Sequence, residues 1–461
     1  MPILKAYALP HPPLAVPAIG RGQERGISKT LESLYKTADE IARIQPETII
    51  YITPHNILYS DYFHISPGVA AIGNFGRFGA SKETLSVEYD VELISKISEI
   101  AQMYGLQAGT EGEKDVKLDH GVMVPMWFIN GRYTGHKAVR VSQSGMEPSA
   151  HYKMGIILKE AVDTLNRKTV LIASADMSHK LKKDGPYGYA HEGPVFDEAV
   201  VKALSCGDFL ALMMIDDNLR ERAAECGYNS LMVLSGAFDR RQVKAEVLSY
   251  EGPFGVGYIV ASFSPGEQDD SRDILRQYEE KVLQDVQLKQ ESADPFRALA
   301  RRSLEHRIMT GRDLPVPNDV PDEMLSNKAG VFVSLHKNGR LRGCIGTIAP
   351  TTANIAGEII QNAVSAGLKD NRFDPVAETE LRFLTYKVDV LAAPEKISGP
   401  GELDVKRYGV IVSNGYKRGL LLPNLDGVDT VEEQIAIARK KGGIAEREPV
   451  QLERFEVVRH E

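Results

Sequence analysis

The first 264 residues alternate short apolar runs with longer amphipathic segments. Four short runs, rich in β-branched residues, predict strands: 48–53 (TIIYIT), 137–143 (KAVRVSQ), 168–176 (KTVLIASAD) and 255–263 (GVGYIVASF). Between them, residues 83–105 and 149–165 carry apolar side chains at three- and four-residue spacing, which predicts helices. This alternation is typical of an α/β domain whose central sheet is mostly buried between flanking helices.

A polar, turn-rich stretch at 264–273 (SPGEQDDSRD) then interrupts the pattern, as domain boundaries do. After it, apolar residues recur every four positions and predict a helix: Ile274, Tyr278, Val282 and Val286. We therefore expect a first domain at 1–264, a polar boundary and linker helix at 265–292, and a second domain at 293–461.

The second domain opens with a predicted helix, for which Asp294 is the expected N-cap and Pro295 the first helical residue. From residue 330 onward the pattern changes to short strand-like runs. Asn-Gly pairs at 338–339 and 414–415 predict the turns of two β-hairpins. The second domain is therefore expected to be α+β with an antiparallel sheet.

Composition and charge narrow the classes of function. A length of 461 residues fits two domains, and a net charge of −8 disfavours binding to nucleic acid. The chain has no run of 18 apolar residues and no signal-peptide pattern at its start, so we expect no membrane span. Three cysteines in so long a chain indicate reduced thiols in the cytoplasm.

Potential catalytic side chains follow the predicted strands of the first domain. His55 comes just after strand 48–53, and His11 follows a short apolar stretch in LPHPP. In SADMSH, Asp176 ends the predicted strand 168–176 and His179 lies just past it, and His120 begins the apolar run in LDHGVMVPMWF. Because ligands of open α/β sheets bind beyond the carboxyl ends of the strands, we expect these side chains to converge on one site.

An acid and a thiol, Glu225 and Cys226, stand next to each other before a predicted helix. Each can ligate a metal, and the positive N-terminal end of the helix favours an anionic group. The other interpretation is a capping glutamate beside a small buried thiol. Two neutral imidazoles and one anionic ligand form an open site for a divalent metal, and with iron(II) this site leaves positions for substrate and dioxygen. Nearby histidines and an aspartate can then move protons.

These segments also resemble a known family. LPHPP, ITPHN, GNFGRFGA, LDHGVMVPMWF, SADMSH, DGPYGYAHEGPVFD and AAECGYNS together resemble the class III extradiol dioxygenase superfamily (LigB-like), on its Memo-like branch, over roughly residues 1–262. The resemblance implies that His11 and His55 hold non-haem Fe(2+). Ring-cleaving members use a glutamate as third ligand and Memo-like proteins a cysteine, so both Glu225 and Cys226 stay candidates, with the register favouring Cys226.

The resemblance further implies that His179, with Asp176 beside it, is the acid–base histidine and that His120 faces the substrate. The expected function is that of an oxidoreductase acting on a small phenolic or catechol-like aromatic compound. A thiolate from Cys226 is softer than a carboxylate, so zinc or copper would also suit the site, and ring cleavage would not follow directly from the fold.

The second half resembles the AMMECR family over about 293–461, most clearly in LRGCIGT (341–347) and GLLLP (419–423). Within LRGCIGT, Cys344 lies in a predicted glycine-flanked turn near Arg342. It is either a reactive thiol with a lowered pKa or a small buried side chain in a tightly packed turn. We expect KDNRFDPV (369–376) to line the same neighbourhood.

The fusion of the two halves resembles proteins of the AmmeMemoRadiSam system, which are usually associated with a radical SAM protein. This resemblance implies a second possible function. In that case the chain is a metal-containing partner or carrier for a radical SAM enzyme and has no ring-cleaving activity of its own.

Overall fold

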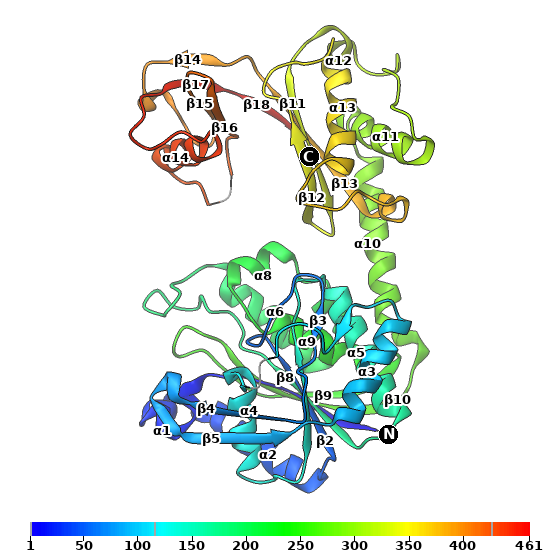
Figure 1. The fold of residues 1–461 in the computed structure, drawn as a ribbon, viewed down its shortest axis with the longest axis vertical. Helices are drawn as coiled ribbons and strands as arrows, with labels where there is room; N and C mark the ends of the chain where they lie inside the picture. Colours follow the sequence, from blue (N-terminus) through cyan, green and yellow to red (C-terminus); the bar gives the residue numbers. More distant parts are fainter. Residues whose placement is uncertain (1, 115–116, 426) are drawn as a thin grey trace. The chain divides into compact units, whose positions relative to one another are not determined.

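In the computed structural model the chain forms two compact units, Met1–Glu279 and Glu280–Glu461 (Figure 1). The structure describes residues 2–114, 117–425 and 427–461. Each unit has its own hydrophobic core, so each is described by itself.

The first unit is built on a six-stranded sheet with strand order β7-β2-β8-β1-β10-β9. Its strands are β1 Ile3–Leu9, β2 Thr48–Thr53, β7 Lys137–Ser142, β8 Thr169–Ser174, β9 Arg241–Glu251 and β10 Tyr258–Gln268. Strands β7, β2, β8 and β1 run parallel, whereas β10 is antiparallel to both β1 and β9. Every residue of β2 and β8 is buried, as expected for central strands covered on both faces.

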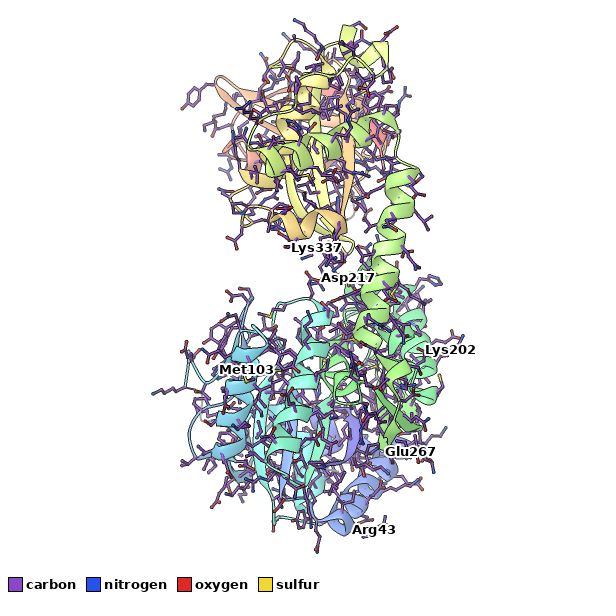
Figure 2. The ribbon with its side chains drawn as sticks, turned by 90° about the vertical axis from the view of Figure 1, so that its right-hand side faces the viewer. Arg43, Met103, Lys202, Asp217, Glu267 and Lys337 are labelled. Carbon is purple, nitrogen blue, oxygen red and sulfur yellow. The ribbon has the colours of Figure 1, made fainter. Side chains whose placement is uncertain are left out.

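Two groups of helices flank this sheet: α5 packs against both α3 and α9, and α2 packs against α4 (Figure 1). The helices are α1 Pro17–Gly20, α2 Ser28–Ile44, α3 Val91–Met103, α4 His120–Asn130, α5 Pro148–Thr164, α6 Glu192–Cys206, α7 Phe209–Met213, α8 Asp217–Ala223 and α9 Tyr228–Gly236. Charged residues of this unit face solvent, among them Arg43, Lys202 and Glu267 (Figure 2). The α/β prediction for this half is confirmed.

Smaller elements complete the first unit. They are the strands β3 Phe63–His64, β4 Ala70–Phe75, β5 Ala80–Glu88 and β6 Ala108–Gly109, and the 3-10 helices η1 Pro13–Ala15, η2 Gln23–Ile27, η3 Gly76–Phe78 and η4 Asp270–Arg272.

The predicted helix at 83–105 is wrong in its first part. Residues 80–88 form β5, which pairs antiparallel with β4, and helix α3 begins only at Val91. The side chain of Asp90 caps that helix by accepting a hydrogen bond from the Leu93 N–H (3.2 Å). Leu85 and Val87 are less exposed than the polar residues on either side of each, so this segment follows the period of two that a strand requires.

The polar stretch 264–273 is also more ordered than predicted. Its first five residues continue β10, which pairs with β9 as far as Gln268. The predicted helix after it is confirmed as α10, Ile274–Glu291, and the division between the two units falls inside this helix.

The second unit contains two four-stranded sheets, with strand orders β12-β11-β13-β18 and β14-β17-β15-β16. Their strands are β11 Gly330–Lys337, β12 Arg340–Gly346, β13 Leu384–Leu391, β14 Glu395–Ile397, β15 Gly409–Asn414, β16 Lys417–Leu421, β17 Gln451–Phe455 and β18 Val457–His460. The helices are α11 Pro295–Thr310, α12 Asp322–Ser326, α13 Ile355–Leu368 and α14 Val431–Lys441, with 3-10 helices η5 Glu378–Phe383 and η6 Pro400–Glu402. All pairings in both sheets are antiparallel, which confirms the α+β prediction.

The predicted helix cap and one of the two predicted hairpin turns of this unit are confirmed. Asp294 caps α11 by accepting from the N–H groups of Phe296 and Arg297. Asn338 and Gly339 both have positive φ (53° and 79°), as a two-residue type I′ hairpin turn requires. The second hairpin turns one residue later than predicted, because Asn414 still pairs with Lys417. Within the described ranges, no helix is long and apolar enough to cross a membrane.

Candidate metal centre

Three adjacent parallel strands deliver the predicted site residues to one edge of the first sheet. His11 and His55 each come two residues after the end of their strand, β1 and β2, and each follows a proline. Asp176 comes two residues after the end of β8, which lies between β1 and β2. Cys226 stands just before α9, which packs against β8 and β1. The parallel topology therefore brings together residues that are far apart in the sequence.

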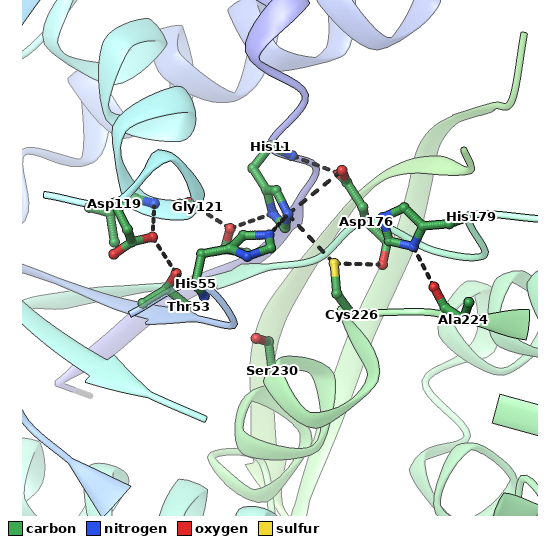
Figure 3. A network of polar contacts seen from close by, with 12 residues as sticks. His11, Thr53, His55, Asp119, Gly121, Asp176, His179, Ala224, Cys226 and Ser230 are labelled. Atoms are coloured by element: carbon green, nitrogen blue, oxygen red, sulfur yellow. Dashed lines mark hydrogen bonds and ion pairs between the residues drawn. The ribbon is translucent and has the colours of Figure 1, made fainter. Parts of the chain in front are cut away.

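Ligand-type atoms of His11, His55 and Cys226 lie within 4.8 Å of one another (Figure 3). The two Nε2 atoms are 2.9 Å apart, and Cys226 Sγ is 3.6 Å from His11 Nε2. Two nitrogens bound to one ion at about 2.0–2.1 Å lie no more than about 4 Å apart, and an N–S pair slightly further. The measured separations meet this condition, and two imidazoles with one sulfur form a donor set that accepts iron(II), zinc or copper(I).

A hydrogen-bond chain determines which nitrogen of His11 carries the proton. The Ser174 hydroxyl donates to the Gly121 carbonyl (2.6 Å), so its oxygen can only accept from His11 Nδ1–H (2.8 Å). The lone pair of His11 is therefore on Nε2, which faces His55 and Cys226. Histidines that bind metals are commonly oriented by such a contact at the other ring nitrogen.

Burial and the neighbouring imidazoles keep both histidines neutral. Burial lowers the pKa of His11 well below its usual value, and charge on His55 and His120 would lower it further. Burial of the ring lowers the pKa of His55 in the same way, and charge on His120 and His179 would lower it further, although His55 is the more accessible of the two. A neutral imidazole is the form that binds a metal.

Glu225 and Cys226 have different surroundings. The Glu225 carboxylate accepts a hydrogen bond from the N–H of Tyr228 (2.6 Å), the first residue of α9, and it is not part of the histidine–cysteine cluster. Burial, and then the charges of Asp176 and Glu225, raise the pKa of the Cys226 thiol well above its usual value. The geometry thus fits a capping role for Glu225, while a thiolate at Cys226 requires a cation beside it.

Asp176 contacts His11. Its carboxylate accepts from the His11 backbone N–H (2.8 Å), and its second oxygen lies 3.6 Å from His11 Nε2. Burial raises the pKa of Asp176 to about 7. The structure therefore places this carboxylate against His11, whereas the sequence had associated it with His179.

His179 presents a free nitrogen. Its Nδ1 lies 2.5 Å from the carbonyl oxygen of Ala224 (Figure 3) and must donate to it, because a carbonyl only accepts. The lone pair of Nε2 is then available to take a proton. Burial lowers the pKa of His179, so the ring is in the neutral form that a base requires.

His120, the first residue of α4, stacks on His55 with ring centroids 4.0 Å apart. The side chain of Asp119 caps α4 by accepting from the Val122 N–H and also accepts from the Thr53 hydroxyl (2.6 Å). This cap holds the start of α4 against the end of β2, the strand that precedes His55. His120 is thereby held next to His55.

Two aromatic residues of the site lie in motifs that the sequence analysis quoted without singling them out. The Phe78 ring meets His120 edge-on at 5.5 Å between centroids, and the Tyr187 ring meets His179 at 5.0 Å. They belong to GNFGRFGA and DGPYGYAH. Ser174, which orients His11, opens SADMSH near the end of the predicted strand 168–176, and the sequence analysis did not single it out.

In the second unit, Cys344 lies within strand β12 and not in a turn. Its sulfur accepts from the Ser334 hydroxyl (3.2 Å), and its N–H donates to Asp370 (2.9 Å). Arg372 reaches the Cys344 carbonyl (3.2 Å) and also binds Asp370 (2.6 Å). The expectation that segment 369–376 lines this neighbourhood is therefore confirmed.

Arg342 is turned toward a different partner. Its guanidinium makes two hydrogen bonds to Glu380 (3.1 and 3.0 Å). The cationic side chain that is hydrogen-bonded to the Cys344 backbone is therefore Arg372. The glycines of LRGCIGT serve close packing, since a Cβ on Gly343 would lie 2.1 Å from the Ala366 carbonyl oxygen and one on Gly346 2.2 Å from the Phe332 ring.

Comparisons with known proteins match both halves. The family described as "Catalytic LigB subunit of aromatic ring-opening dioxygenase" matches residues 5–261, and the AMMECR1 family matches residues 297–460. The protein CA_C1420 of Clostridium acetobutylicum is 43% identical over 98% of both chains. A Thermotoga maritima protein is 47% identical over 36% of this chain and 97% of its own length. The crystal structure of the uncharacterized protein PH0010 from Pyrococcus horikoshii is 33% identical, covers 36% of this chain and 88% of that chain, and has a TM-score of 0.34. The chain belongs to the LigB family and carries an AMMECR1 domain in its second half.

Proposed function

We propose that the LigB domain is a non-haem iron(II)-dependent oxidoreductase that acts on a phenolic or catechol-like aromatic compound with dioxygen. The observation that carries this proposal is the approach of His11, His55 and Cys226 to within 4.8 Å of one another, in a domain of the LigB family. Iron(II) bound there would supply redox chemistry with dioxygen and a Lewis acid for the phenolic oxygen. With three protein ligands, positions stay open for substrate.

The chain's own residues supply the remaining functions. His179 takes the phenolic proton through Nε2, since its Nδ1 is committed to the Ala224 carbonyl. Phe78 and Tyr187 form aromatic walls beside His120 and His179, which favours a flat aromatic substrate. His120, stacked on His55, faces that substrate.

One specific observation favours a second candidate function. The side chain that joins the two histidines is the Cys226 thiol, whereas the neighbouring Glu225 carboxylate is engaged at the start of α9. A thiolate donates more charge than a carboxylate and is itself sensitive to oxidation. These properties suit a metal-containing partner or carrier of a radical SAM enzyme, in which zinc or copper would also be accepted.

The first experiment is metal analysis by mass spectrometry of protein purified without oxygen. Wild type is compared with His55→Ala, Cys226→Ala and Glu225→Ala. We expect iron close to one per chain in wild type and Glu225→Ala, and little in the other two variants. Absence of metal from every sample after iron reconstitution would overturn the proposal.

A second measurement separates the two candidate functions. Oxygen uptake with a series of catechols and phenols is followed for the iron-loaded protein. Turnover that disappears in His179→Ala, with iron retained, supports the oxidoreductase. A metal-loaded protein without turnover that forms a stable complex with a radical SAM protein supports the carrier.

A further inference from the structure

The AMMECR1 domain contains a cavity of about 630 Å³ whose charged lining is mostly cationic. Its charged lining residues come from α10, α11 and β13 and from the end of the described chain: Lys289, Arg297, Arg301, Arg302, Lys387 and Glu461. Among the described residues that line it, Glu461 is the single carboxylate. The volume falls within the range of small-molecule sites, which is roughly 300–1,000 Å³.

Neighbouring groups hold two of the arginines in place. Arg297 donates to the Ser292 carbonyl (2.9 Å) and pairs with Asp294 (3.4 Å), and Arg301 donates to Gln290 (3.1 Å) and pairs with Glu305 (3.1 Å). They are four residues apart on α11 and therefore lie on the same face of the helix. Because the guanidinium groups are already ordered, a ligand loses less side-chain entropy when it binds them.

The two lysines are easily available to a ligand. Lys289 is exposed and makes no ion pair within the part of the chain that the structure describes. Lys387 pairs with Glu461 (2.7 Å), and both side chains are about half exposed, at 45% and 52%. Exposed pairs of this kind are weak, so an incoming anion can compete with Glu461 for the lysine.

Tyr386 contributes to the wall of the cavity, and its side chain is only 5% exposed. The hydroxyl of Tyr386 is itself buried, so the charged side chains are the groups that would contact a ligand.

We propose that this cavity binds a small organic molecule that carries two or more negative charges as oxyanions, either a polyphosphate or a polycarboxylate. Planar guanidinium groups recognise phosphate and carboxylate by paired hydrogen bonds, and Arg297 and Arg301 form one wall of the site. Ala293 and Ala298 add apolar surface for the rest of the ligand. The site lies within the second domain and does not depend on the function proposed for the metal centre.

The test is isothermal titration calorimetry of the full-length protein with pyrophosphate and, separately, with citrate, at a constant ionic strength of about 0.15 M. The double variant Lys289→Gln/Lys387→Gln is compared with Lys328→Gln, an exposed lysine of the same domain outside the cavity. We expect saturable binding of at least one anion, weakened about tenfold or more in the double variant and unchanged in Lys328→Gln. Binding of pyrophosphate alone identifies a phosphate ligand, and binding of citrate alone a carboxylate ligand.

Three results would overturn the proposal. The first is no saturable binding of either anion, and the second is equal affinity in the double variant and in wild type. The third is binding that persists in the double variant but disappears in His55→Ala, which would assign the anion to the metal centre. Lys289→Glu is tested as a second variant of the cavity, beside the double variant. Lys289 is exposed, so its replacement is not expected to disturb folding.

Discussion

His11 Nδ1 lies 2.8 Å from the Ser174 hydroxyl oxygen, and that hydroxyl donates its own hydrogen to the Gly121 carbonyl. One buried serine therefore orients a potential metal ligand and connects it to the first turn of α4, the helix that begins with His120. Figure 3 shows the cluster of His11, His55 and Cys226 together with Gly121, the last member of this chain.

Replacing Ser174 by alanine is expected to weaken metal binding about 10- to 100-fold, because His11 then loses the contact that holds its proton on Nδ1. Competition with a chelator measures the affinity, and ¹⁵N NMR of the metal-free protein reports which ring nitrogen carries the proton. Ser235→Ala is the matched control, since it also removes a buried hydroxyl that donates to a carbonyl of the first unit (2.8 Å to Leu231). An equal loss of affinity in both variants would contradict the orienting role of Ser174.

Removing the metal is expected to destabilise the LigB domain and leave the AMMECR1 domain unchanged, because all three candidate ligands belong to the first unit. A ligand that binds only the folded state adds roughly 3 kcal/mol when its free concentration is about 100 times its Kd. Differential scanning calorimetry with and without a chelator measures the effect on each transition. His55→Ala should already melt at the lower temperature and should not respond to the chelator.

His136 is expected to make the first domain sensitive to acid. It is 8% exposed, neither ring nitrogen has a hydrogen-bond partner among the described residues, and burial lowers its pKa to about 4. Between pH 6.5 and 4 the unfolded chain binds a proton at His136 that the folded protein does not bind. The free energy of unfolding should therefore fall as the pH falls through this window, by up to about 3 kcal/mol from this residue.

Urea unfolding of wild type and His136→Leu from pH 7 to pH 4 measures that contribution. We expect a shallower decline with acid in the variant. His191 is exposed, so the His191→Gln variant serves as the control. Its free energy of unfolding should decline with acid as steeply as that of wild type. Identical slopes in wild type and His136→Leu would show that His136 does not cause the acid sensitivity.

Alanine at Gly343 is expected to destabilise the AMMECR1 domain by about 1–3 kcal/mol, because its Cβ would lie 2.1 Å from the backbone oxygen of Ala366. Backbone on α13 cannot move aside as a flexible side chain would. Gly399→Ala provides the comparison, since a Cβ there meets nothing within 4 Å. Chemical denaturation followed by circular dichroism measures the free energy of unfolding of both variants. Similar values would show that β12 and α13 can move apart with little loss of stability.

Where structure depends on neighbours in the sequence, the sequence was sufficient. The apolar run 48–53 forms the buried strand β2, the four-residue spacing from Ile274 forms α10, and Asn338-Gly339 forms a tight turn. The helix predicted at 83–105 was wrong in its first part because local periodicity was the sole basis of that prediction. Residues 83–88 precede a true helix, and their pairing with β4 is a contact that local periodicity does not reveal.

The sequence by itself determined two domains of α/β and α+β class and the chemical types of the candidate site residues. The tertiary structure decided which of them meet: Cys226 joins His11 and His55, Glu225 contacts the start of α9, and Arg372 approaches Cys344 where Arg342 had been expected. The physical reason is that propensity and periodicity act over a few residues, whereas these contacts depend on the order of strands in the sheet. Distances of a few ångströms between residues such as 11 and 226 exist only once that order is established.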